Sequence, residues 1–358
     1  MTNYLLAGGG TAGHVNPLLA LADAIKAQPG KHNVYALGTE EGLEKRLVPF
    51  RGYVLLTVPR LPMPRKPNRY ALTFPLKFKA SVDLVKRYLL ENKIDVVVGF
   101  GGYASAPAYR AAKLLNIPYV VHEANALPGY ANKVGAKSAA AVAITFSKTQ
   151  LPKAVLTGMP LRQEVIAVAD GNLRKEAAKF FDLNPKLPTL LVTGGSLGAK
   201  RINETIEASR KLFQAAGIQV LHIVGDRAGL TALKDQDYRR ISYCDRMDLA
   251  LAASDFAVAR AGAATVSEFA AVGLPAVLVP YPVGNGEQRF NAEDLVEAGG
   301  AVLVDDANFT PEYVSQTLLP LLSNPAKTKE MAERSFRLGL RDGSKRLLAL
   351  VNAVIKSN

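Results

Sequence analysis

The sequence predicts an α/β fold made of two Rossmann-like, doubly wound domains that face a cleft. Strand-like and helix-like segments alternate from the first residues, and this alternation restarts once after Leu156. Each half opens with a strand that runs into a glycine turn. A chain of 358 residues is also long enough for two domains, each with its own core. We expect Gly158–Arg162 (GMPLR) to be the linker between them.

The composition limits the class of protein. Hydrophobic residues make up 49% of the chain and charged residues 21%, which is ordinary for a globular protein. Cys244 is the only cysteine, so a disulfide framework is excluded and a reducing compartment is favoured. The start MTNYLLAGGG lacks the layout of a signal peptide, and no apolar run approaches a membrane span. We therefore expect a soluble or peripheral protein.

The positive charge is concentrated in the first half. The net charge is +13, and residues 1–160 carry 20 Lys and Arg against 8 Asp and Glu, a net of +12. This asymmetry favours an anionic partner such as a membrane surface, a phosphorylated lipid or a nucleic acid. A basic surface that only keeps the protein soluble is the alternative.

The first glycine turn follows a strand at Asn3–Ala7 and precedes a helix at about 15–28. Gly8, Gly10 and Gly13 fit G-x-G-x-x-G, a pattern whose backbone N–H groups hold phosphate at a helix N-terminus. Dinucleotide binding would also need an acidic residue that closes the second strand. Gly38 and Thr39 stand there instead, which weakens the hypothesis of an NAD-dependent dehydrogenase.

Further elements follow in order. We expect a helix at 42–50, strands at 53–58, 94–98, 118–121, 139–144 and 154–156, and a helix from about Ser105 after a second glycine loop, Gly99–Tyr103. The second half has strands at 189–192, 219–224, 241–243, 256–259, 276–279 and 301–304, helices at about 200–216, 265–272 and from 287, and a helical region from Pro311 to the end.

The segment Pro59–Lys79 is rich in proline, basic residues and large apolar residues. The helix that follows it buries a stripe of Phe78, Val82, Val85 and Leu89. A second apolar set falls outside this stripe, beside cations, as a membrane-surface site requires: Leu72, Phe74, Leu76, Lys77 and Lys79. A partner interface or an ordinary packed loop is the alternative.

Two loops after neighbouring buried strands in the second half suit a hydroxyl-rich ligand. One loop leads into the helix that contains Glu268, and the other leads into the helix that contains Gln288. A carboxylate and an amide are suited to ribose or sugar hydroxyls, and Glu268 would otherwise be a solvated helix residue. Asp235-Gln236-Asp237 matches a D-x-D metal pattern, but we interpret it as a solvated loop and expect no metal or cofactor. His32 and His222 are expected to be structural.

Six stretches, in the same order along nearly the whole chain, resemble the MurG family within glycosyltransferase family 28. They are GGGTAGHVNPLLALA, GFGGYASAP, HEANALPGYANK, TGGSLGA, RAGAATVSEFAAVGLPAVLVPYP and EQRFNA. The resemblance implies a GT-B fold and inverting transfer of N-acetylglucosamine from UDP-N-acetylglucosamine to the C4 hydroxyl of the muramyl sugar of lipid I. The product would be lipid II, the precursor of peptidoglycan.

The resemblance also implies locations and contacts. Residues 1–160 would bind acceptor and the cytoplasmic side of the cell membrane, the helix at about 341–358 would pack back on them, and residues 161–340 would bind the donor. Cell-wall synthesis proteins are candidate partners, and no nucleic acid is expected. The acceptor or phosphate loop would be Gly101, Gly102 and Tyr103. The donor contacts would be Thr11, Ala12, Gly13, Asn125, Arg162, Ser196, Cys244, Ala263, Ala264, Thr265, Val266, Ser267, Glu268 and Gln288.

The catalytic base has two candidates, His14 and Glu123. His14 follows the first glycine turn, and the positive end of its helix keeps an imidazole neutral and able to accept a proton. Glu123 ends a strand of the same domain, and a third interpretation is that His14 only positions a phosphate or the turn. Other activities stay open: a UDP-N-acetylglucosamine 2-epimerase, a glycolipid or natural-product glycosyltransferase, or a non-enzymatic basic binding protein.

Overall fold

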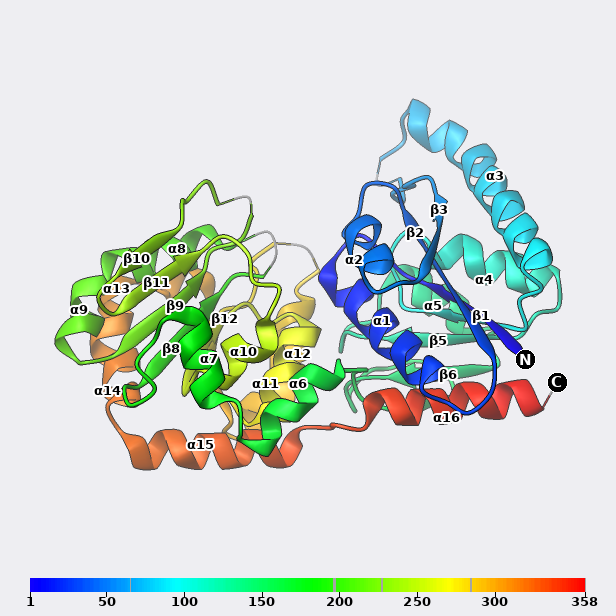
Figure 1. Cartoon of the computed structure of the whole chain (residues 1–358). Coiled ribbons are helices and arrows are strands. Elements are labelled where there is room, and N and C mark those ends of the chain that lie inside the picture. The colour runs from blue at the N-terminus through cyan, green and yellow to red at the C-terminus, as the bar shows by residue number, and fades with distance from the viewer. Residues whose placement is uncertain (65, 196–197, 227, 284, 358) are drawn as a thin grey trace. The chain divides into compact units, whose positions relative to one another are not determined.

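The computed structural model describes residues 1–64, 66–195, 198–226, 228–283 and 285–357. The chain divides into two compact units (Figure 1). Unit 1 comprises Met1–Arg162 together with Asp342–Asn358, and unit 2 comprises Gln163–Arg341. Each unit contains one seven-stranded sheet, so the predicted pair of Rossmann-like α/β folds is confirmed.

The sheet of unit 1 has the strand order β3-β2-β1-β4-β5-β6-β7, and all its neighbouring strands are parallel. Its strands are β1 (Thr2–Ala7), β2 (His32–Thr39), β3 (Val54–Val58), β4 (Val96–Gly99), β5 (Tyr119–Glu123), β6 (Ala141–Ile144) and β7 (Ala154–Leu156). Its helices are α1 (Ala12–Lys26), α2 (Glu44–Phe50), α3 (Arg69–Glu91), α4 (Ser105–Leu114), α5 (Tyr130–Ala136) and α16 (Gly343–Lys356).

Helices cover both faces of this sheet, because its strands are apolar on both sides. One core joins β1 and β4 to α1 and to the C-terminal helix α16, whose Leu347 and Val351 are fully buried. The opposite core joins the same sheet to α3 and α4. Figure 1 shows α16 lying along unit 1, although all of unit 2 separates it from the rest of unit 1 in the sequence.

The sheet of unit 2 has the strand order β10-β11-β9-β8-β12-β13-β14, with β10 antiparallel to β11. Its strands are β8 (Thr189–Thr193), β9 (Gln219–Ile223), β10 (Leu233–Asp235), β11 (Tyr238–Ile241), β12 (Phe256–Ala259), β13 (Ala276–Leu278) and β14 (Ala301–Leu303). Its helices are α6 (Gln163–Ala167), α7 (Arg174–Phe181), α8 (Lys200–Ala208), α9 (Arg210–Ala215), α10 (Met247–Ala252), α11 (Ala263–Val272), α12 (Glu287–Glu297), α13 (Pro311–Tyr313), α14 (Leu319–Leu322) and α15 (Pro325–Leu338). Short 3-10 turns occupy Val168–Asp170 and Asp306–Asn308, and a π-helical turn occupies Val314–Leu318.

The structure corrects three details of the sequence prediction. Helix α3 begins at Arg69, inside the segment that we placed ahead of it, because the side chain of Asn68 accepts the N–H of Ala71 at 2.9 Å and caps the helix. The helix expected at 200–216 breaks at Ser209, whose hydroxyl donates to the Thr205 carbonyl at 2.8 Å. Asp235 was placed in a solvated loop, but it ends strand β10 of a hairpin, whose second strand β11 spans Tyr238–Ile241 instead of the expected 241–243.

Candidate functional site

Two glycine loops of unit 1 meet where the strand order of its sheet reverses. They follow β1 and β4, which are neighbours in the sheet, and this switch point is where open α/β sheets bind ligands. Gly102 has a φ of +76°, and a Cβ atom there would lie 2.6 Å from the Gly9 carbonyl oxygen. Only glycine permits both this backbone conformation and this approach, so the two loops pack directly against each other.

His14 lies in the first turn of α1, between these two loops. Its Nδ1 is 3.1 Å from the Gly9 carbonyl oxygen, and the Thr11 hydroxyl is 3.4 Å from the same nitrogen. A carbonyl oxygen only accepts hydrogen bonds, so Nδ1 carries the proton and Nε2 of the neutral ring is left with its lone pair. Nε2 lies on the side of Gly101, where a Cβ atom would be 3.3 Å away.

Burial is the main influence on the charge of His14. It lowers the pKa of the imidazole below 6.5, while the charges of Glu123 and Glu44 and the hydrogen bond to Gly9 oppose that shift. The ring is therefore mainly neutral at pH 7. The neighbouring His122 is fully buried, and burial lowers its pKa to about 4.

Glu123 ends β5 and is buried, with 2% of its surface exposed. Its carboxylate accepts the N–H of Asn125 at 2.8 Å, the N–H of Gly129 at 3.0 Å and the side-chain amide of Asn132 at 2.9 Å. Asn132 in turn accepts the hydroxyl of Tyr109 at 2.8 Å. The carboxylate thus fixes the loop between β5 and α5.

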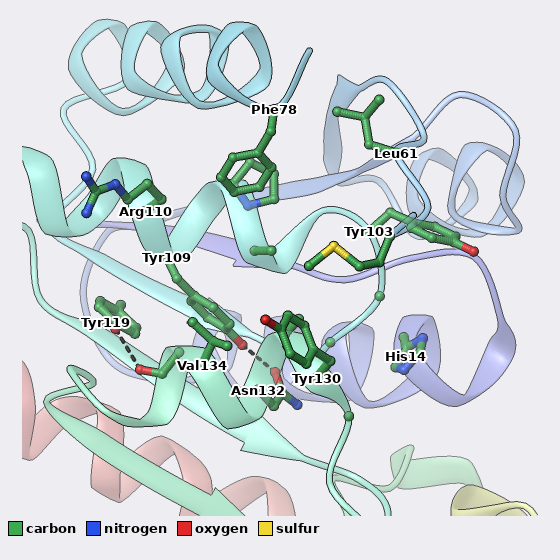
Figure 2. A pocket seen from close by; sticks show the side chains of 18 of the residues that line it. His14, Leu61, Phe78, Tyr103, Tyr109, Arg110, Tyr119, Tyr130, Asn132 and Val134 are labelled. Atoms are coloured by element: carbon green, nitrogen blue, oxygen red, sulfur yellow. Dashed lines mark hydrogen bonds between the residues drawn. The ribbon is translucent and has the colours of Figure 1, made fainter. Parts of the chain in front are cut away.

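A cavity of about 600 Å³ opens beside His14 within unit 1 (Figure 2). Its walls come from His14 of α1, the second glycine loop, the segment at 59–63, strand β5 and helices α3, α4 and α5, and they are mostly apolar. Figure 2 shows His14 at one end and Arg110 at the other, with Tyr109 and Tyr130 between them. An apolar cavity with a few polar groups at its ends is typical of a site for a small ligand.

The predicted residues of unit 1 fall into two groups. The cavity is lined, with His14, by Gly101, Gly102, Tyr103, Glu123 and Asn125. Helix α1 begins beside them with Thr11, Ala12 and Gly13.

On α3, Phe74 stacks on Phe78 and lines the cavity. Leu72 and Leu76 are instead 81% and 73% exposed, beside the exposed Lys77 and Lys79. Arg162 is the last residue of the unit before α6.

Unit 2 repeats the switch point between β8 and β12. Gly262 caps α11, which carries Ala263, Ala264, Thr265, Val266, Ser267 and Glu268, and Glu268 is 8% exposed. Gln288 lies on α12 and accepts the N–H of Tyr281 at 3.0 Å through its side chain. Cys244 is a half-buried thiol after β11, and Ser196 lies outside the described residues.

Comparison with known proteins decides the family. The model of the glycosyltransferase family 28 N-terminal domain matches residues 4–144, and that of the C-terminal domain matches residues 189–347. The chain belongs to glycosyltransferase family 28. It is a glycosyltransferase, as its resemblance to that family implied.

Relatives within family 28 match along their whole length. A protein of Leifsonia xyli is 56% identical over 98% of both chains, and one of Streptomyces coelicolor is 49% identical over 99% of this chain and 98% of the relative. Both are named UDP-N-acetylglucosamine--N-acetylmuramyl-(pentapeptide) pyrophosphoryl-undecaprenol N-acetylglucosamine transferase.

Solved structures agree with the fold. MurG of Acinetobacter baumannii has a TM-score of 0.77 and 27% identity, covering 99% of this chain and all of that one. A putative UDP-N-acetylglucosamine 2-epimerase of Listeria monocytogenes has a TM-score of 0.73 at 13% identity, covering 100% of this chain and 97% of that one. The second match shows the fold alone.

Sequence reasoning missed three residues of this family 28 site. Tyr109 and Asn132 connect the cavity wall to Glu123, and Glu44 lies behind the first glycine loop. Gly38 and Thr39 end β2 and are followed by the exposed Glu40 and Glu41, whereas the buried Glu44 begins the next helix.

Proposed function

We propose that the chain transfers N-acetylglucosamine from UDP-N-acetylglucosamine to the C4 hydroxyl of the muramyl sugar of lipid I, which yields lipid II. The observation that carries this proposal is the 56% identity, over 98% of both chains, to a relative named for that transfer. The cavity beside His14 supports it, since an acceptor hydroxyl needs a neutral base within reach. The proposal extends to peptidoglycan synthesis, cell shape and cell division.

The transfer itself is tested with labelled donor. Label from the sugar of UDP-N-acetylglucosamine should appear in a lipid I analogue with release of UDP, and free donor alone should stay unchanged. Epimerisation of the free donor at C2, or no label in the acceptor, would contradict the proposal. The Acinetobacter baumannii MurG, assayed in parallel, is a positive control for the acceptor.

The proposed division of labour assigns the donor to unit 2 and the acceptor to unit 1. Glu268 binds both hydroxyls of the donor ribose, and Gln288 and the start of α11 complete the donor site. The acceptor sugar lies beside His14 with its C4 hydroxyl at Nε2. As the hydroxyl oxygen bonds to the anomeric carbon of the donor, UDP leaves from the opposite face and Nε2 takes the hydroxyl proton.

The role of His14 has a direct kinetic test. His14→Ala should lower kcat by about 10²–10⁴-fold, the usual contribution of a general base, and leave donor affinity unchanged. Because burial lowers the pKa of His14, wild-type kcat/KM should fall only below pH 6.5, and the variant should lose this acidic limb.

Glu123→Gln is the matched comparison for His14→Ala. It removes a charge from a buried network and should lower the free energy of unfolding by about 1–3 kcal/mol. The acidic limb should persist but move to lower pH, because Glu123 raises the pKa of His14. Near-normal turnover of His14→Ala, with abolished turnover of a folded Glu123→Gln, would assign the proton to the carboxylate instead.

The donor contact is tested by calorimetry. Glu268→Ala should weaken UDP binding by about 2–3 kcal/mol, because a charged hydrogen-bond acceptor is lost. Glu268→Gln keeps the shape of this nearly buried side chain, and Glu333→Ala removes an exposed acid on α15 as a control. Unchanged UDP affinity in both Glu268 variants would refute the assignment.

We also propose that unit 1 attaches peripherally to the cytoplasmic side of the cell membrane through the N-terminal half of α3. Within the described ranges, no helix combines the length and apolarity needed to cross a bilayer. Leu72 and Leu76 are one helical turn apart and exposed, and Lys77 and Lys79 flank them. Phe74 has a different role in this proposal, because it lines the cavity.

Vesicle sedimentation tests the attachment. Leu72→Ser with Leu76→Ser should reduce binding to anionic vesicles, and added salt should reduce it further because it screens the lysines. Leu90→Ser with Leu114→Ser, two other exposed leucines of unit 1, is the matched control. Equal sedimentation of both double variants with the wild type would place the membrane contact elsewhere.

A further inference from the structure

Glu44 is a buried carboxylate that the reaction just described does not use. It begins α2, and only 1% of its surface is exposed. Oε2 accepts the N–H of Gly10 at 2.8 Å, and Oε1 accepts both the N–H and the hydroxyl of Thr39 at 2.7 Å. Burying a charge is costly unless it is paired or well hydrogen-bonded, so these three donors account for its presence.

The surrounding backbone is shaped to hold this carboxylate. A Cβ atom would lie 2.3 Å from a Glu44 atom at Gly9, 2.4 Å at Gly38 and 2.1 Å at Gly42. The three glycines belong to the turn after β1, to β2 itself and to the turn after β2. Each leaves room for the same side chain, so the pocket of Glu44 is built from separate parts of unit 1.

One peptide group connects Glu44 to His14. The carbonyl of Gly9 and the N–H of Gly10 belong to the same trans peptide, so they point in opposite directions. His14 donates from Nδ1 to this carbonyl at 3.1 Å, and the N–H on the other side donates to Glu44 at 2.8 Å. A charge-assisted bond to the N–H polarises the peptide and strengthens its carbonyl as an acceptor.

We propose that Glu44 is the positioning residue of the catalytic base, acting on His14 through the Gly9–Gly10 peptide. By fixing that peptide it holds the imidazole with the proton on Nδ1 and the lone pair of Nε2 free. A carboxylate that orients an imidazole directly is the usual arrangement in hydrolases, and here one peptide group stands between the two. The inference rests on the proposed role of His14.

The hydrogen bond from Gly10 to Glu44 gives the first glycine turn a role other than phosphate binding. The N–H of Gly10 is a donor that such a turn would offer to phosphate, and Glu44 already occupies it. A phosphate at that position would also face a carboxylate.

The orientation of His14 is measured by ¹⁵N nuclear magnetic resonance of the full chain. The chain has four histidines, and His14→Ala assigns the signal of interest. Wild-type His14 should show the tautomer protonated at Nδ1 at neutral pH. A dominant Nε2–H tautomer in the wild type would overturn the proposal without any variant of Glu44.

Two variants separate the charge of Glu44 from its shape. Glu44→Gln keeps the shape but removes a charge that, together with Glu123, raises the pKa of His14 against the effect of burial. The acidic limb of kcat/KM should move to lower pH, and kcat should fall about 10–100-fold with the KM for donor unchanged. Glu44→Asp keeps the charge but moves the carboxylate away from Gly10. Its kcat should fall, while the acidic limb of kcat/KM should move less than in Glu44→Gln.

Glu40→Gln is the matched control, because it removes an exposed acid four residues earlier. It should leave kcat, the pH profile and the tautomer unchanged. Wild-type kcat and an unmoved acidic limb in a folded Glu44→Gln would show that Glu44 is structural only. An inactive wild-type chain would refute the proposed transfer instead, and the tautomer measurement would still decide the role of Glu44.

Discussion

The contact between Gly102 and the Gly9 carbonyl is the constraint on which the site of unit 1 depends. The loops after β1 and β4 approach so closely there that a side chain on Gly102 would displace the carbonyl. That carbonyl is the acceptor for His14, and His14 and the loop after β4 both line the cavity. Moving either loop would therefore reorient the imidazole and reshape the cavity together. Parallel strands β1 and β4 hold both loops at one edge of the sheet, so the precision of the site comes from the sheet.

Patterns of apolar residues predicted the strands and helices well, because each pattern reflects which faces of an element are buried. Buried parallel strands need continuous apolar runs, and the bounds of β12 follow such a run residue for residue. Boundaries failed where one side chain decides them. Asn68 starts α3 ahead of a proline-containing turn, and Ser209 ends α8 by bonding back to Thr205. Neither event changes the periodicity of apolar residues, so periodicity could not reveal them.

The residues of the candidate site that lie close in sequence to a glycine turn were the most directly predictable. His14 follows such a turn, and Gly101–Tyr103 form another. Glu44 reaches Gly10 from 34 residues away, and Tyr109 reaches Asn132 across 23 residues. A sequence does not state which way a buried carboxylate points, and an exposed Glu40 and a buried Glu44 look alike in it. Glu123 is a similar case. Its place at a strand end favoured a catalytic role in the sequence, and only the structure shows that its carboxylate has four hydrogen-bond contacts.

The glycine turns after β1 and β8 differ in the charge of the groups that their N–H groups contact. This difference favours different ligands for the two turns. In unit 1 the N–H of Gly10 donates to a buried carboxylate. In unit 2 the N–H of Gly195 donates to the hydroxyl of Thr193, and that of Gly198 donates to the carbonyl of Gly195. Both acceptors in unit 2 are neutral, so an incoming diphosphate would meet no charge from them, whereas in unit 1 it would be repelled by Glu44. A nucleotide diphosphate is thus expected on the turn of unit 2. The turn of unit 1, with its internal carboxylate, is better suited to hold a neutral base for a hydroxyl.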